Sequence, residues 1–198
     1  KALIRNTSDE AKIAQLKDFG CTLAEGDLKD PASLAQACQG VKAVISTASS
    51  TFSRQDGDSI QTVDLEGQLN LVAAAKAAGV EQFILISFPD TVGYDNPLND
   101  AKRAVEQSLQ ESGMNYTSLQ ANYFMEIWLS PALGFDFPNQ AVRIYGEGQT
   151  ATSFVSYVDV AKMAVACLDH PAAKNQLLSF GGPTALSPLE VVQLFEQV

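Results

Sequence analysis

One stretch, from residue 59 to residue 90, constrains the fold of this chain more than any other. Small and apolar residues recur there every three or four positions, as on one face of a helix of about five turns: Ile60, Val63, Gly67, Leu71, Ala74 and Ala78. A glycine inside a helix costs roughly 1 kcal/mol relative to alanine, so Gly67 on this face predicts that the helix backbone lies close against a sheet. Gly79 ends the helix, and residues 83–87 (FILIS) then form an apolar run typical of a strand covered on both faces.

Similar alternation continues along the whole chain. We expect strands at residues 1–5, 21–25, 41–46, 83–87, 116–119, 141–145, 153–158 and 176–180, and helices at 9–19, 30–39, 60–78, 99–112, 159–168 and from 187 onward. Thr7 or Ser8 is expected to cap the first helix, with Phe19 on its inner side. Alternating strands and helices predict an α/β fold with a parallel sheet. Ligands bind such sheets beyond the carboxyl ends of the strands, which directs attention to Ser87 and Phe88.

Composition excludes several classes of function. The 198 residues include 23 acidic and 13 basic side chains, a net charge of −10, which argues against nucleic acid or an anionic membrane as a partner. No apolar run approaches the roughly 20 residues of a membrane span. The three cysteines form no CxxC pair and there is one histidine, so no metal site is expected, and the odd cysteine count favours a reducing cytoplasm.

Candidate binding residues follow three of the expected strands. Arg5 ends the first, where an arginine accommodates a ribose 2′-phosphate and an acid would hold the 2′-hydroxyl; the alternative is a solvated loop residue. Asp27 with Leu28 could bracket an adenine ring, or Asp27 could be a turn aspartate. The small side chains of residues 47–50 suit close approach by a cofactor, although any small loop reads similarly.

A set of short motifs, in order along nearly the whole chain, resembles the NmrA-like branch of the atypical short-chain dehydrogenase/reductases. The motifs are Ala2–Asn6, Glu25–Leu28, Gly67 with Asn70, Ala78–Val80 before FILIS, Ala101–Lys102 with Val105–Glu106, Ser112–Gly113 before Tyr116–Thr117, Tyr123–Glu126, Gly146–Gly148, Tyr157–Ala161 and Gly182–Pro183. Each motif is weak alone, but their order and spacing make the set specific.

The resemblance implies a Rossmann-like doubly wound fold that binds NADP(H), in a family whose members reduce quinones, isoflavones or related ethers and ketones, or only sense the cofactor. It assigns the cofactor site to Arg5, Asn6, Asp27, Leu28, Thr47, Ala48, Ser49, Ser87, Phe88 and Lys102, and the substrate site to Asn122, Tyr123 and Phe124. Lys102 looks like the lysine that binds the nicotinamide ribose and lowers the pKa of a nearby proton donor. The alternative is an exposed helix lysine. Because Ala101 and Val105 are expected to carry the packing, Lys102→Ala should change stability little.

The sequence departs from the family pattern in three places. Leu98 stands four residues before Lys102, where short-chain enzymes have a tyrosine; Tyr94 is the nearest phenol, and no proton donor is assigned. Residues 120–122 read Gln-Ala-Asn where the family often has arginine and proline. The first strand and GxxGxxG turn of the family are not in this sequence, so we expect residues 1–120 to be an incomplete dinucleotide-binding domain that alone binds dinucleotide poorly.

We expect residues 121–198 to form a small substrate-side region, truncated at its end. In the 3-2-1-4-5-6 strand order of the fold, the missing strand would lie between the strands at 1–5 and 41–46, so these two should not pair in ordinary register. The leading function is an NADP(H)-dependent reductase of a small quinone-like, aromatic or carbonyl substrate. The alternatives are an NADP(H)-sensing regulator, or an assembly factor with a protein partner and no turnover.

Overall fold

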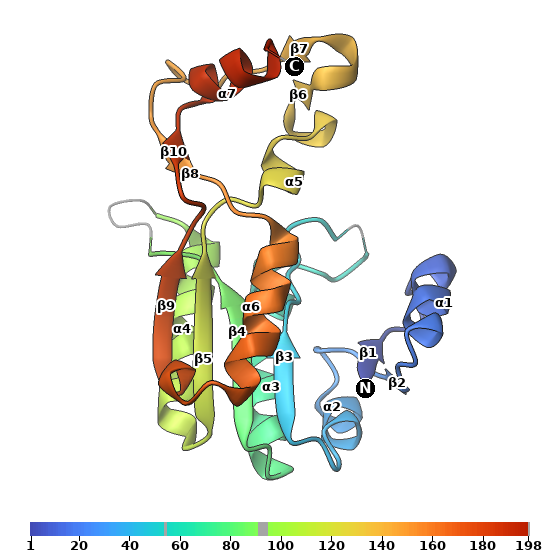
Figure 1. Cartoon of the computed structure of the whole chain (residues 1–198). Helices are drawn as coiled ribbons and strands as arrows, with labels where there is room; N and C mark the ends of the chain where they lie inside the picture. Colours follow the sequence, from blue (N-terminus) through green and yellow to red (C-terminus); the bar gives the residue numbers. More distant parts are fainter. Residues whose placement is uncertain (54, 91–94, 198) are drawn as a thin grey trace. The chain divides into compact units, whose positions relative to one another are not determined.

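Strands and helices alternate along the chain in a computed structural model that describes residues 1–53, 55–90 and 95–197 (Figure 1). The strands are β1 (Ala2–Ile4), β2 (Leu23–Glu25), β3 (Ala43–Ser46), β4 (Gln82–Ser87), β5 (Asn115–Ala121), β6 (Phe135–Asp136), β7 (Ala141–Val142), β8 (Thr152–Ser153), β9 (Gln176–Phe180) and β10 (Ala185–Leu186). The α-helices are α1 (Glu10–Asp18), α2 (Pro31–Ala37), α3 (Glu66–Ala77), α4 (Pro97–Ser112), α5 (Met125–Trp128), α6 (Tyr157–Asp169) and α7 (Pro188–Phe195). A π-helix, η1 (Ile60–Leu65), precedes α3, and short 3₁₀ turns are η2 (Pro131–Leu133), η3 (Phe137–Asn139) and η4 (Pro171–Ala173).

In the described ranges, the strands form one four-stranded sheet and three two-stranded sheets. The larger sheet has the order β3-β4-β5-β9, and β3 runs parallel to β4 with Ala43 opposite Gln82. The pair β1-β2 is also parallel, whereas β6-β7 and β8-β10 are antiparallel. The predicted α/β class with a parallel sheet is confirmed. Within the described residues, β1 pairs with β2 and β3 pairs with β4, so the two strands expected not to pair lie in different sheets.

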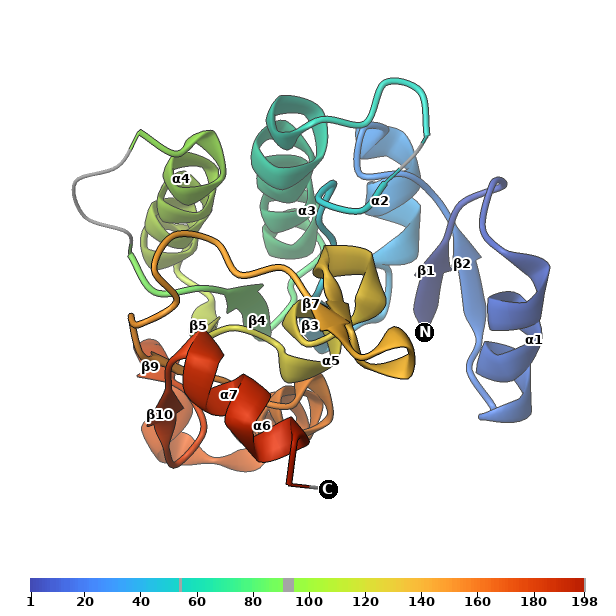
Figure 2. The ribbon, with the colours of Figure 1, turned by 90° about the horizontal axis from the view of Figure 1, so that it is seen from above.

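Two compact units divide the chain. Unit 1 comprises Lys1–Leu85 and Asp90–Thr117, and unit 2 comprises Ile86–Pro89 and Ser118–Val198. In unit 1, helices α2, α3 and α4 lie side by side (Figure 2) and enclose a core that includes Leu34, Leu71, Phe83 and Leu109. Unit 2 has its own apolar cluster around Ala121, Val155 and Val160.

Gly67 allows α3 to approach Leu28, in the loop after β2. A Cβ atom at Gly67 would lie 2.8 Å from the Leu28 Cβ and 2.9 Å from the Thr62 carbonyl oxygen. The predicted close approach is therefore present, but the neighbour is a loop residue and not a strand. Leu28 is buried as a result, and its carbonyl oxygen accepts a hydrogen bond of 3.1 Å from Asn70 Nδ2.

The expected helix at 60–78 begins as a π-helix. The hydrogen bonds of a π-helix close over five residues instead of four, which widens the turn. Ser59 caps η1 through a reciprocal pair of hydrogen bonds with Thr62, and the consecutive residues Val63 and Asp64 are both buried. The apolar stripe in the sequence predicted the first of these two and not the second.

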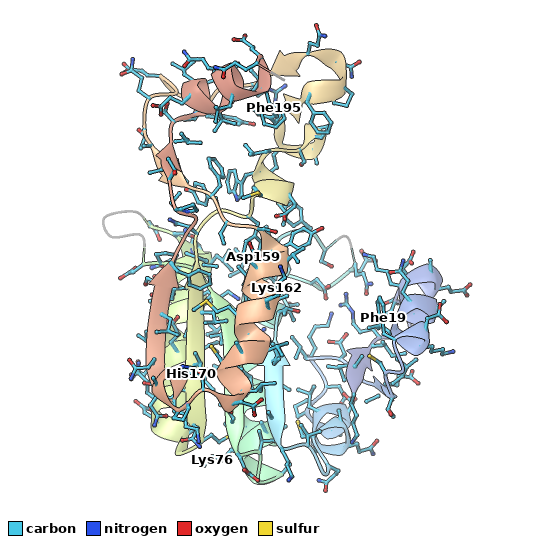
Figure 3. The ribbon with its side chains drawn as sticks, in the orientation of Figure 1. Phe19, Lys76, Asp159, Lys162, His170 and Phe195 are labelled. Atoms are coloured by element: carbon cyan, nitrogen blue, oxygen red, sulfur yellow. The ribbon has the colours of Figure 1, made fainter. Side chains whose placement is uncertain are left out.

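The first helix differs from its prediction at both ends. Asp9, not Thr7 or Ser8, is the cap, and its side chain accepts from Lys12 N at 2.9 Å. Ser8 Oγ instead accepts from Arg5 N at 2.9 Å, which turns the chain out of β1. Phe19, labelled in Figure 3, follows the last regular turn and is 81% exposed, so its predicted inward position is wrong.

In unit 2, the strand expected over 153–158 is shorter. Ser156 Oγ accepts from Val158 N at 3.1 Å and so starts α6 two residues before Asp159, the expected first residue. The strand expected over 141–145 is limited to Ala141–Val142. The strand Gln176–Phe180 and the cap at Ser187 are confirmed. Phe195 of α7 (Figure 3) meets the edge of Phe135 with ring centroids 4.7 Å apart.

Candidate functional site

The buried carboxylate of Asp58 pairs with two cations, Arg5 and Lys29, where β1 and β2 end. Arg5 Nη1 donates to Asp58 Oδ2 at 2.8 Å, Lys29 Nζ pairs with Asp58 Oδ1, and Ser53 Oγ donates to Asp58 Oδ2. The Asp58 side chain is only 2% exposed. Burial alone would raise the pKa of Asp58, but the hydrogen bonds from Arg5, Lys29 and Ser53 outweigh burial and hold this pKa well below its usual range. Asp58 therefore stays ionised.

Asp27 adds a second negative charge to the same place. Its Oδ2 lies 3.9 Å from Arg5 Nη1 and 3.8 Å from Lys29 Nζ, and its Oδ1 accepts from Lys29 N at 2.8 Å. Asp27 has the hydrogen bond of a turn aspartate and also faces both cations, and its part in an adenine pocket stays a prediction. The two positive charges of Arg5 and Lys29 therefore balance the two negative charges of Asp27 and Asp58.

Whether this group can bind a 2′-phosphate depends on the N–H donors of Arg5 that the protein itself does not use. Its side chain is 30% exposed, and within the described residues only its Nη1 donates to a protein acceptor. A guanidinium has five N–H donors, so Nε and Nη2 can still bind phosphate oxygens. The exposed Asn6 follows directly. Leu28 packs in the apolar core of unit 1, and its role in an adenine pocket stays a prediction.

Helix α3 fixes the turn after β3 by hydrogen bonds of Gln68. Gln68, fully buried, donates from Nε2 to the Ala48 carbonyl oxygen at 2.9 Å and accepts from Ser46 Oγ at 2.8 Å. The side chains of Thr47 and Ser49 remain exposed, and Ser49 Oγ lies 2.9 Å from Thr51 Oγ1. The turn is therefore fixed on one side and open on the other, as a surface along a cofactor would need to be.

Asp64 of η1 connects this turn to Lys102 of α4. Its Oδ2 accepts from Ser50 N at 2.9 Å and from Ser50 Oγ at 2.6 Å, while its Oδ1 lies 3.8 Å from Lys102 Nζ. Asp64 is fully buried and Lys102 is only 5% exposed. The alternative of an exposed helix lysine is therefore wrong. The burial also gives a reason to expect that Lys102 contributes to stability, because its removal would leave a buried carboxylate without this counter-charge.

The pKa of Lys102 is lowered, with burial as the main cause. The negative charges of Asp64 and Glu106 oppose this shift, and the positive charge of Arg103 adds to it. A buried ionisable group with a shifted pKa is a candidate for a functional role.

The remaining predicted site residues lie in unit 2. Ser87, the last residue of β4, is buried, and Phe88 after it is half-buried. Asn122 donates from its backbone N to the Phe180 carbonyl oxygen at 2.9 Å, and Phe124 packs against the apolar cluster of unit 2. Tyr123 is 46% exposed and stacks on Trp128 with ring centroids 4.5 Å apart. Tyr94 lies outside the described residues.

The sequence predicted that Arg5 and Asp27, and the turn after β3 and Lys102, belong to one site. It did not predict the residues whose side chains connect them. These are Lys29, Asp58, Asp64 and Gln68. A signal existed for two of them, because Asp64 and Gln68 are four residues apart and would share one face of an otherwise apolar helix. No local pattern marked Asp58, whose partners are distant in the chain.

Across the part of the chain that the structure describes, no helix is long and apolar enough to cross a bilayer. The same residues contain no cluster of histidine, cysteine and carboxylate side chains suited to a metal ion.

Solved structures with the same architecture define the class. Triphenylmethane reductase from Citrobacter sp., complexed with NADP(H), matches with a TM-score of 0.79 at 20% identity, over 96% of this chain and 64% of that one. The NADPH-dependent quinone oxidoreductase QOR2 from Escherichia coli, complexed with NADPH, matches with a TM-score of 0.77 at 25% identity, over 99% of this chain and 64% of that one. The fold is thus that of the Rossmann-like α/β reductases.

The chain belongs to the NmrA-like family, whose model matches residues 1–198. The photosystem II assembly factor Ycf39 of Synechocystis sp. is 32% identical over 94% of this chain and 57% of its own length. An NAD(P)H azoreductase of Xenophilus azovorans is 34% identical over 96% of this chain and 62% of its own length. The chain therefore spans less than two thirds of the length of these relatives.

Proposed function

We propose that the protein is an NADP(H)-dependent reductase of a small quinone-like, aromatic or carbonyl substrate. The observation that carries the proposal is the buried pair of Lys102 and Asp64, joined through Ser50 to the turn after β3. Desolvation makes a buried ion pair a weak contributor to stability, and an apolar pair of similar volume often does better. A charge kept in such a place favours a role in binding or chemistry.

Each group of residues has a distinct task in this proposal. Bound NADPH supplies the hydride. Arg5, with Lys29 beside it, binds the 2′-phosphate, and the exposed side of the turn at Thr47–Ser49 lies along the cofactor. The ammonium of Lys102 binds the ribose hydroxyls next to the nicotinamide and lowers the pKa of a neighbouring proton donor.

The substrate-side residues in the proposal are Asn122, Tyr123 and Phe124, whereas Ser87 and Phe88 at the end of β4 belong to the cofactor site. Trp128 joins the substrate-side residues because it stacks on Tyr123. Exposed stacked rings suit a planar aromatic substrate. The named substrates of similar proteins, azo compounds and triphenylmethane dyes among them, agree with this chemistry. For location we propose a reducing cytoplasm, on the cysteine count.

A second candidate is a regulatory or assembly protein of the same fold that binds NADP(H) without turnover and acts through a protein partner. Leu98, in place of the tyrosine four residues before Lys102, favours it, because no proton donor is assigned. The 32% identity to a photosystem II assembly factor favours it as well.

Calorimetric titration of the full protein with NADPH and with NADH tests the cofactor. We expect NADPH to bind at least tenfold more tightly, and Arg5→Ala to remove most of that preference, because a charge-assisted hydrogen bond is worth about 1.5–3 kcal/mol. Lys12→Ala, on the exposed face of α1, is the matched control. Equal affinities for the two dinucleotides would contradict the proposal.

NADPH oxidation with a panel of quinones, azo dyes and aromatic ketones then separates the two candidates. Turnover that falls in a Lys102→Met variant supports the reductase. Tight NADPH binding with no turnover on any member of the panel supports the regulatory or assembly protein.

A further inference from the structure

We propose that Asp64 is a positioning residue for Lys102: its carboxylate keeps the ammonium protonated and ties it to the turn at residues 47–50. This inference rests on the proposed function, since it assigns how the ribose-binding cation is held. The geometry is direct. One carboxylate oxygen of Asp64 accepts both hydrogen bonds from Ser50, and the other oxygen faces Lys102 Nζ at 3.8 Å.

The second oxygen of Asp64, Oδ1, accepts no hydrogen bond within the described residues. The Asp64 side chain is nevertheless fully buried. Buried carboxylate oxygens normally have donors, so this one calls for a specific explanation. The ammonium of Lys102 is the cation paired with it, at a distance longer than a hydrogen bond. Attraction between the charges, and not a hydrogen bond between them, therefore couples Asp64 to Lys102.

The π-helix gives Asp64 this orientation. Along η1 the consecutive side chains of Val63 and Asp64 are both buried, and η1 packs against α4, which carries Lys102. Val63 belongs to the apolar core, so Asp64 is the polar member of the pair. Wide helical turns of this kind occur frequently at functional sites.

Other charges act on Lys102 from its own helix. Glu106, one turn further along α4, is buried and raises the pKa of Lys102, while Arg103 lowers it and is itself paired with Glu106 at 3.1 Å. The Arg103–Glu106 pair is partly self-compensating. Asp64 is the counter-charge that reaches Lys102 from another element, and it acts more strongly on its pKa than Glu106 does.

A pH titration of Lys102 in the cofactor-free full protein tests the inference. Lysine side chains labelled with ¹³C at Cε report the charge of each ammonium by NMR, and Lys102→Arg identifies the Lys102 signal. Asp64→Asn keeps an oxygen for Ser50 and removes the charge. It should lower the pKa of Lys102 by roughly one unit or more. Ser50→Ala removes the side-chain hydrogen bond to Asp64, leaves the one from the backbone N, and keeps the charge of Asp64, so the Lys102 titration should stay at the wild-type position.

Two results would overturn the inference. One is an unchanged Lys102 titration in Asp64→Asn, and the other is an equal shift in Ser50→Ala. If Asp64→Asn does not fold, the Asp64→Asn/Lys102→Met double variant decides. It should fold if the carboxylate balances the ammonium, and failure of both variants would mean that Asp64 supports the fold independently of Lys102.

NADPH binding measured against pH keeps the inference distinct from the proposed function. Affinity should fall as the pH rises through the pKa of Lys102, and in Asp64→Asn this fall should occur at a lower pH by the same shift that NMR reports. A wild-type protein that binds no NADPH would contradict the proposed function, whereas the cofactor-free titration would still decide the coupling of Asp64 to Lys102.

Discussion

Arg5 Nη1 donates a 2.8 Å hydrogen bond to Asp58 Oδ2, although 53 positions separate the two residues in the chain. Lys29 pairs with the other oxygen of the same carboxylate. A second polar tie lies close by in sequence, from Thr7 Oγ1 to Gln55 Oε1 at 2.6 Å. The long loop between β3 and η1 is thus anchored to the residues that follow β1 and β2.

Replacing Asp58 should test this anchor. Asp58→Asn removes the charge that both cations share, and at pH 7 it should lower the free energy of unfolding by about 1.5–3 kcal/mol, measured by urea denaturation. The folded-state pKa of Asp58 lies below its unfolded value, so its contribution is present above about pH 4 and is lost as the pH falls further. The difference between wild type and Asp58→Asn should therefore shrink on acidification. Asp56→Asn, at an exposed site in the same loop, is the control, and equal losses for both variants would contradict the anchor.

Gly67→Ala should destabilise the protein although alanine is the better helix former. The added methyl group would lie 2.8 Å from the Leu28 Cβ, and such overpacking costs about 1–3 kcal/mol. The gain in helix propensity is only about 1 kcal/mol. Thermal unfolding of Gly67→Ala, Leu28→Gly and the double variant measures the contact, because only glycine at position 28 removes the Cβ atom that the new methyl group meets. The two losses should add up to more than the loss in the double variant, and strict additivity would show that Leu28 is not the obstacle.

Lys102→Met should be costly for stability as well as for cofactor binding. Breaking a buried pair by removing one partner typically costs about 3–5 kcal/mol, because the other charge stays buried. Urea denaturation should show a loss towards that range. Lys76→Met, at an exposed position of α3 (Figure 3), should change the unfolding free energy by less than about 0.5 kcal/mol. Similar small effects for the two lysines would mean that no buried charge depends on Lys102.

Trp128 is the one tryptophan in the sequence, and it can report on the substrate-side region. It is 45% exposed, and Tyr123 covers one face of its ring. Tyr123→Ala should therefore expose the indole and shift its fluorescence emission to longer wavelength. Tyr145→Ala, at a site where the tyrosine is 69% exposed, should leave the emission unchanged. An unshifted spectrum in Tyr123→Ala would show that the stack does not persist in solution.

Much of the fold could be predicted because its signals are local. Asp30 with Pro31 marked the start of α2, and Gly113, which adopts a left-handed φ of 82°, marked the end of α4. The apolar run of β4 gave the strand itself. Such caps and runs depend on neighbours in the sequence and need no tertiary contact to be recognised.

What could not be predicted depends on contacts between distant segments. Asp58 acquires its role from Arg5 and Lys29, and Asp64 acquires its role from Ser50 and Lys102. One motif of the family also has a structural explanation that the sequence did not reveal. Glu126 accepts hydrogen bonds from Ser156 Oγ and from Tyr157 N, and so stabilises the start of α6.

The π-helix before α3 makes this segment sensitive to length in a way that ordinary helices are not. Gln61 is exposed, so substitution there should be tolerated, like most exchanges on a protein surface. Deleting it is different, because one residue fewer would let the wide turn close into an α-helix and rotate the preceding residues by about 100° about the axis. Ser59 would then lose its reciprocal cap, and the residues leading back to Asp58 would point elsewhere. In evolutionary terms, insertions and deletions, rather than substitutions, are the changes that this part of the chain should exclude.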